Sequence, residues 1–83
     1  MIVVGSLESS DCLITLKPSS TKEIVIESVV YDTFKDQIET VINTTLKQHN
    51  LDNVHVLCQD KGALDFTIEA RLTTAIERFK ERD

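Results

Sequence analysis

In residues 12–17, Cys12, Ile14 and Leu16 alternate with Leu13, Thr15 and Lys17, a period of two that is typical of a β-strand. Residues 2–7 and 12–17 are predicted to form two strands around the polar tip Glu8-Ser9-Ser10-Asp11. A polar turn with Pro18 follows, and proline interrupts the hydrogen bonding of a sheet. Residues 24–30, rich in β-branched side chains, are predicted to form a third strand.

The period then changes to that of a helix. Apolar side chains recur at helical spacing through residues 31–46 with polar side chains opposite them, which predicts a helix of about 17 residues with one buried stripe. We expect Asp32 or Thr33 to cap its start, and Asn50 to end it in a left-handed conformation. Residues 54–58 alternate again and are predicted to form a fourth strand.

Residues 64–70 fit two patterns. Their even-numbered apolar positions alternate as in a strand, whereas a longer apolar stripe that reaches Phe79 recurs at helical spacing. Length favours a second helix starting near Ala63. The predicted order β-β-β-α-β-α is an α+β fold, a small two-layer domain with a mixed four-stranded sheet and two helices, and residues 1–83 are expected to form a single domain.

The connections predict where the loops meet. A strand–helix–strand passage over residues 24–59 should be a right-handed crossover, which makes the third and fourth strands parallel. Meander connections before it make the first strand run in the same direction as the third. The tip and the starts of the two helices, near Asp32 and Gly62, are therefore expected at one end of the sheet, where ligands gather in open sheets.

Composition and charge exclude several classes of partner. Nine Lys and Arg against 14 Asp and Glu give a formal net charge of −5, and an acidic surface repels phosphate backbones and anionic lipid. No apolar run exceeds four residues, against the roughly 18–20 needed to cross a bilayer. We therefore expect a cytoplasmic protein with no nucleic-acid or membrane partner.

Patterns for catalysis and metal binding are scarce. The two glycines lie too far apart for a dinucleotide- or phosphate-binding loop. His49 and His55 lack ligand spacing with each other or with the cysteines, so no metal site is expected. Cys12 and Cys58 each continue an apolar strand face and are interpreted as buried, unpaired thiols. The polar tip is either an ordinary hairpin turn or a rigid projection of a serine to which something is attached.

Two motifs resemble the acyl carrier (gamma) subunit of citrate lyase. The segment Gly5-Ser6-Leu7-Glu8-Ser9-Ser10-Asp11 is similar to that family's G-[ST]-L-E-S-G-D. The segment Asp60-Lys61-Gly62-Ala63-Leu64-Asp65 is similar to its D-K-G-A-L-D, and Ala70-Arg71-Leu72 follows at the family's distance. The resemblance covers almost the whole chain, with both motifs in order and at the right separation.

This resemblance implies a carrier that is not an enzyme by itself. The serine after Leu-Glu, here Ser9, would carry 2'-(5''-phosphoribosyl)-3'-dephospho-coenzyme A through a phosphodiester, attached by a prosthetic-group transferase. The thiol of this arm would hold an acetyl group, which the alpha subunit exchanges for citryl with release of acetate. The beta subunit would then split the citryl carrier into oxaloacetate and the acetyl carrier. The protein contributes attachment, reach and recognition.

The sequence departs from the family pattern at Ser10, where the family has glycine. Glycine would permit a positive φ in the turn, whereas serine adopts it at an energetic cost. Two hydroxyls therefore compete, and Ser9 is the expected attachment site because Leu7-Glu8 is intact, with Ser10 as the alternative. We also expect Lys61 and Gly62 to form a shelf for the phosphodiester at the start of the second helix. The plain alternative is a strand-to-helix turn with a solvated lysine, and a third is a docking surface for a lyase subunit.

Two other functions stay open from the sequence. The acyl carrier of malonate decarboxylase uses the same kind of arm, although its motifs differ from those found here. A non-catalytic interaction domain with unmodified serines is the alternative from another class.

Overall fold

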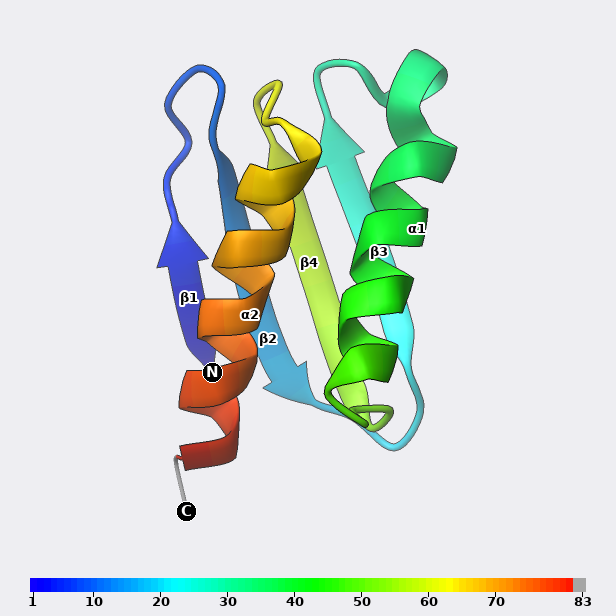
Figure 1. Cartoon of the computed structure of the whole chain (residues 1–83), viewed down its shortest axis with the longest axis vertical. Coiled ribbons are helices and arrows are strands. Elements are labelled where there is room, and N and C mark those ends of the chain that lie inside the picture. The colour runs from blue at the N-terminus through cyan, green and yellow to red at the C-terminus, as the bar shows by residue number, and fades with distance from the viewer. Residues whose placement is uncertain (82–83) are drawn as a thin grey trace.

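The computed structural model describes residues 1–81. Within them, one sheet is covered on one face by two helices (Figure 1). The elements are β1 (Ile2–Gly5), β2 (Cys12–Pro18), β3 (Glu23–Ser28), α1 (Tyr31–Gln48), β4 (Val54–Asp60) and α2 (Asp65–Glu81). The α+β fold and the element order are as predicted, and the ambiguous segment after residue 64 is helical.

The sheet is mixed, with the strand order β1-β2-β4-β3. β4 pairs antiparallel with β2 and parallel with β3, so Cys58 lies between Ile14 and Ile26. β1 runs in the same direction as β3, as predicted. The expected meander is wrong in one respect, because β4 inserts between β2 and β3. The connection over residues 19–22 therefore skips a strand position.

The core lies between the sheet and the two helices. β4 alternates strictly between buried and partly exposed residues, and β2 does so as far as Leu16, because successive side chains of a strand point to opposite faces. The opposite face of the sheet lies away from both helices in Figure 1, and Val3 and Val25 on it are exposed. The buried apolar residues are Val4, Cys12, Ile14, Leu16, Ile38, Ile42, Leu46, Val54, Val56, Cys58, Ile68, Leu72, Ala75 and Ile76.

The ends of α1 show one wrong prediction and one confirmed prediction. The N-cap residue is Val30, so neither Asp32 nor Thr33 caps the helix. Instead the Val30 amide donates to Ser28 Oγ at 3.1 Å, which anchors the chain one turn earlier. At the other end Asn50 has φ of 54°, the left-handed conformation that was expected.

β1 ends two residues earlier than predicted. Gly5 has φ of 109°, and a Cβ at this position would lie 2.0 Å from the Cys12 carbonyl oxygen. The chain leaves the strand geometry there, and the Ser6 amide donates to that same carbonyl at 3.1 Å. This close crossing of the two backbones sets the direction in which the tip projects.

Candidate functional site

Three loops meet at one end of the sheet, as the sequence predicted. They connect β1 to β2, β3 to α1 and β4 to α2, and all lie at the top of Figure 1. The Ser10 amide donates to the Lys61 carbonyl at 2.8 Å, and the Lys61 amide donates to the Asp11 carbonyl at 2.9 Å. Paired backbone bonds therefore fix the tip to the loop after β4.

The tip itself is a β-turn. The Asp11 amide donates to the Glu8 carbonyl at 3.1 Å, which places Ser9 and Ser10 at the two central positions. Ser10 has φ of 68°, and a positive φ at the second central position is the feature that makes type II turns select glycine. The expected conflict at this position is therefore confirmed. Both serines are exposed.

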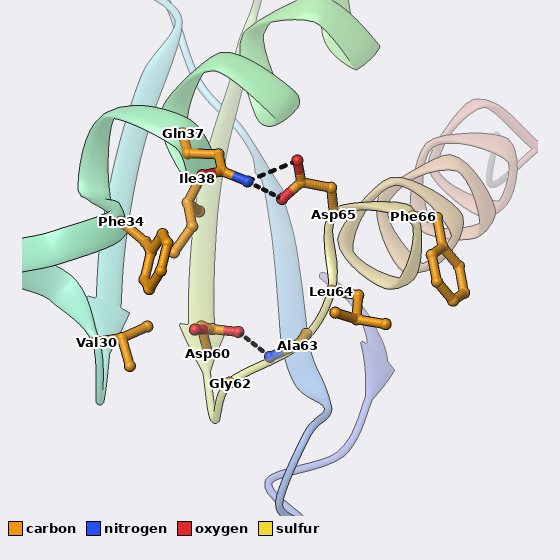
Figure 2. A pocket seen from close by; sticks show the side chains of 10 residues that line it. All are labelled: Val30, Phe34, Gln37, Ile38, Asp60, Gly62, Ala63, Leu64, Asp65 and Phe66. Carbon is orange, nitrogen blue, oxygen red and sulfur yellow. Dashed lines mark hydrogen bonds between the residues drawn. The ribbon is translucent and has the colours of Figure 1, made fainter.

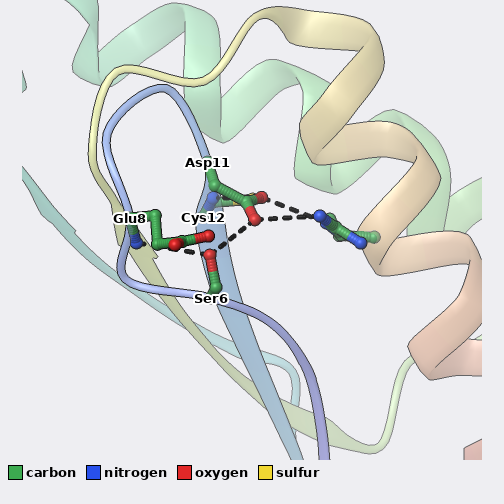
Figure 3. A network of polar contacts seen from close by, with 5 residues as sticks. Ser6, Glu8, Asp11 and Cys12 are labelled. Carbon is green, nitrogen blue, oxygen red and sulfur yellow. Dashed lines mark hydrogen bonds and ion pairs between the residues drawn. The ribbon is translucent and has the colours of Figure 1, made fainter.

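A carboxylate network holds the base of the tip (Figure 3). Asp11 Oδ2 accepts hydrogen bonds from Ser6 Oγ at 2.7 Å and from Arg71 Nη2 at 2.8 Å. Asp11 Oδ1 accepts from Arg71 Nε at 3.0 Å and from the Cys12 amide at 2.7 Å. The bonds from Arg71, then those from Ser6 and the Cys12 amide, lower the pKa of Asp11 from 3.8 to about 2.

This network links the two ends of the sequence and was not predicted. Arg71 belongs to α2, and its bidentate pair with Asp11 spans 60 positions of sequence. Both residues lie in or beside the recognised motifs, but nothing local in the sequence indicates that they meet. The fold brings them together because α2 packs against β1 and β2.

The loop after β4 is shaped by a buried carboxylate. Asp60 is 1% exposed, and it accepts hydrogen bonds from Ser28 Oγ at 2.7 Å and from the Ala63 amide at 2.9 Å. Lys61 and Gly62 are exposed beside the tip. A Cβ at Gly62, whose φ is 92°, would meet no atom within 4 Å.

The structure differs from the expected shelf in the availability of backbone amides. α2 begins at Asp65 and not at Ala63, and the amides of Lys61 and Ala63 already donate to the Asp11 carbonyl and to Asp60. These amides are therefore engaged within the protein. The Lys61 side chain and the open backbone at Gly62 are the parts of the loop that can face an anion on the tip.

A groove lies next to this loop, between the first turns of the two helices (Figure 2). Its volume is about 610 Å³. The sequence analysis missed it, although exposed apolar side chains in the second motif are a signal for such a surface. Its lining residues are Val30, Phe34, Gln37, Ile38, Asp60, Gly62, Ala63, Leu64, Asp65 and Phe66.

The two cysteines are free and buried in the core beneath the site. Their thiols are hydrogen-bonded to each other, and this bond together with burial raises the pKa of Cys58. The same bond lowers the pKa of Cys12, against the opposing effect of burial.

Two features of the structure concern the expectations about metal and membrane. Across residues 1–81, no three His, Cys, Asp or Glu side chains are grouped so that they could hold a metal ion. In the same part of the chain, no helix combines the length and the apolarity needed to span a membrane.

Comparison with known proteins identifies the class first. A family model described as "Malonate decarboxylase delta subunit (MdcD)", with the short name ACP, matches residues 1–79. The match includes the tip, the loop after β4 and most of α2. It places the chain in this acyl carrier family.

Individual relatives narrow this class. A citrate lyase acyl carrier protein from Lactobacillus acidophilus is 49% identical over 80 residues, covering 95% of this chain and 82% of the relative. One from Lactiplantibacillus plantarum is 50% identical, with 95% and 83% covered. One from Treponema denticola is 39% identical, with 96% and 92% covered. The chain belongs to the citrate lyase acyl carrier protein family, which confirms the resemblance found in the sequence.

Proposed function

We propose that this protein is the acyl carrier subunit of citrate lyase and that Ser9 carries its prosthetic arm. The observation that carries the proposal is the turn at the tip, which holds the exposed Ser9 in place through backbone hydrogen bonds to the loop after β4. The names of the relatives support the carrier role. The chemistry of citrate cleavage is then divided between this carrier and two enzymes.

The residues present fit the expected arm, 2'-(5''-phosphoribosyl)-3'-dephospho-coenzyme A in phosphodiester linkage to Ser9. The Ser9 hydroxyl is exposed on a fixed turn, and Lys61 brings a cation to the adjoining loop. When bound, the group supplies the thiol that holds acetyl or citryl as a thioester. The protein's own residues attach the arm, orient the end that is linked to Ser9 and offset the charge of its phosphate.

The network around Asp11 has a positioning role in this proposal. Asp11 and Arg71 hold the turn against α2, so the enzyme that attaches the arm meets one conformation of Ser9. A tethered acyl group also reaches two active sites at a high effective concentration. The implied partners are the alpha (transferase) and beta (lyase) subunits and the prosthetic-group transferase, and the implied location is the cytoplasm.

Intact mass after expression beside the prosthetic-group transferase tests the proposal. The wild-type protein should gain one large adduct above 9.4 kDa. Ser9→Ala should stay unmodified and support no citrate cleavage in the reconstituted complex, whereas Ser10→Ala should be modified. Loss of the adduct in Ser10→Ala but not in Ser9→Ala would assign the arm to Ser10. An unmodified wild-type chain would favour an interaction domain.

A further inference from the structure

We propose that the groove between α1 and α2 is a subsite for the adenosine of the prosthetic arm. The inference rests on the proposed attachment of the arm to Ser9. It assigns a binding role to Phe34, Leu64, Gln37 and Asp65, none of which belongs to the tip. The ligand class is an adenine nucleoside that the chain carries covalently.

The groove lies within reach of an arm on Ser9. The Ser10 amide is bonded to the Lys61 carbonyl, and Gly62, the next residue, already lines the groove. With 3.8 Å between consecutive Cα atoms, Ser9 lies roughly 10 Å from the groove edge. In the arm, only the phosphodiester and one ribose separate the serine from the adenosine. The adenosine is therefore the part of the arm whose tether matches this separation.

The path from Ser9 to the groove is open at Gly62. A Cβ at this position would meet no atom within 4 Å, so the backbone borders free space on this side. The phosphodiester would lie beside Lys61, and the following ribose would pass over Gly62. The glycine and the lysine of the second motif then serve the same ligand as the groove.

The walls of the groove suit a planar ring. Phe34 of α1 and Leu64 before α2 line it and are 43% and 63% exposed. Figure 2 shows Val30 and Phe34 on the α1 side of the groove, and Ala63 and Leu64 on the other side. A base that enters between them stacks on the phenyl ring and covers the leucine side chain, and such stacking is a common way to hold a nucleobase. The volume of about 610 Å³ lies within the usual range for small-ligand sites.

Polar groups close one end of the groove. Gln37 Nε2 donates to both carboxylate oxygens of Asp65 at 2.9 Å. The amide oxygen of Gln37 and the remaining lone pairs of Asp65 are acceptors. Adenine presents an amino donor at its Watson–Crick edge. This end of the groove can therefore accept a hydrogen bond from the adenine amino group.

The test uses NMR of the labelled protein in its apo and holo forms. In the holo form, adenine protons should show NOEs to the Phe34 ring, and the Leu64 methyl signals should move upfield relative to the apo form. In the apo form, AMP should shift the same signals saturably, and pantetheine should not. Phe34→Ala should bind AMP roughly tenfold more weakly, the effect of one lost stacking contact.

The control variant is Val25→Ala, which removes an exposed side chain from the opposite face of the sheet and should bind AMP like the wild type. If Phe34→Ala does not fold, Gln37→Met replaces it and should bind AMP more weakly than the wild type does. Unchanged groove signals in a holo protein that carries the adduct by mass would overturn the subsite while the proposed function stands.

Other outcomes also decide whether the groove is an adenosine subsite. If no adduct forms on Ser9, the proposed function fails. The AMP titration of the apo protein then tests the groove by itself. The absence of a saturable shift in that titration would overturn the subsite. Pantetheine shifts as large as those from AMP would overturn it as well. Groove signals that respond only to an added alpha or beta subunit would instead identify the groove as a protein docking surface.

Discussion

Replacing Ser10 by glycine should stabilise the protein. Ser10 has φ of 68°, and the left-handed conformation costs an L-residue about 1–2 kcal/mol. Its backbone is held there because its amide donates to the Lys61 carbonyl and the turn closes from Asp11 to Glu8. Glycine keeps these backbone bonds and removes only an exposed side chain.

The unfolded state reduces this gain. A glycine gives the unfolded chain extra freedom worth about 0.4–1 kcal/mol. The difference predicts that Ser10→Gly raises the free energy of unfolding by about 0.5–1 kcal/mol. In a domain of this size, that corresponds to a rise in melting temperature of about 2–8 °C.

The assay is urea unfolding followed by far-UV circular dichroism, with a thermal melt beside it. Ser9→Gly is the matched control, because Ser9 occupies the same turn but has no left-handed φ. The control should lower the free energy of unfolding by up to about 1 kcal/mol. If Ser10→Gly is no more stable than the wild type, the strain attributed to this turn is absent.

Three further predictions concern the tip, the core and the loop after β4. Because the pKa of Asp11 is lowered to about 2, its network stabilises the fold above pH 4 and loses this effect as the pH falls towards 2. The stability difference between wild type and Asp11→Asn should shrink over that range in urea titrations, and a constant difference would contradict this. Cys12 and Cys58 should react slowly with a thiol reagent in the folded apo protein and rapidly after unfolding, and fast labelling of the folded protein would contradict their burial. Lys61→Glu should slow attachment of the arm, measured by intact mass, with little change in melting temperature, and Lys61→Gln should slow it less. If Lys61→Glu acquires the arm at the same rate as the wild type, Lys61 is a solvated residue with no role in attachment.

Periodicity and connection rules predicted most of the fold. The alternation of β2 and the helical stripe of α1 are local patterns, and a parallel pair around a helix follows from chain chirality. The position of β4 between β2 and β3 could not be obtained in this way, because the adjacency of strands depends on packing between distant segments. The N-cap of α1 also differed, since Ser28, bonded to Asp60 of β4, anchors the chain before Asp32.

For the site, the topology predicted that the loops carrying the two motifs meet. The backbone strain at Ser10 could be expected from the sequence, because serine stands where the family has glycine. The positive φ of Ser10 confirms this expectation. The Asp11–Arg71 pair depends on how α2 lies over the hairpin, which no local pattern specifies. The groove depends on the space left between two helix starts, and such space is a property of the packed molecule.

The insertion of β4 into the middle of the sheet has a consequence for how the protein is made. β2 and β3 precede β4 in the chain, yet each pairs with β4. Before residues 54–60 have left the ribosome, the chain holds only the β1–β2 hairpin and unpaired segments, and an isolated hairpin is marginally stable in water. Folding therefore waits for β4 and then proceeds as one late step. Chains cut short before β4 lack Lys61, so their tip has no loop on which to dock.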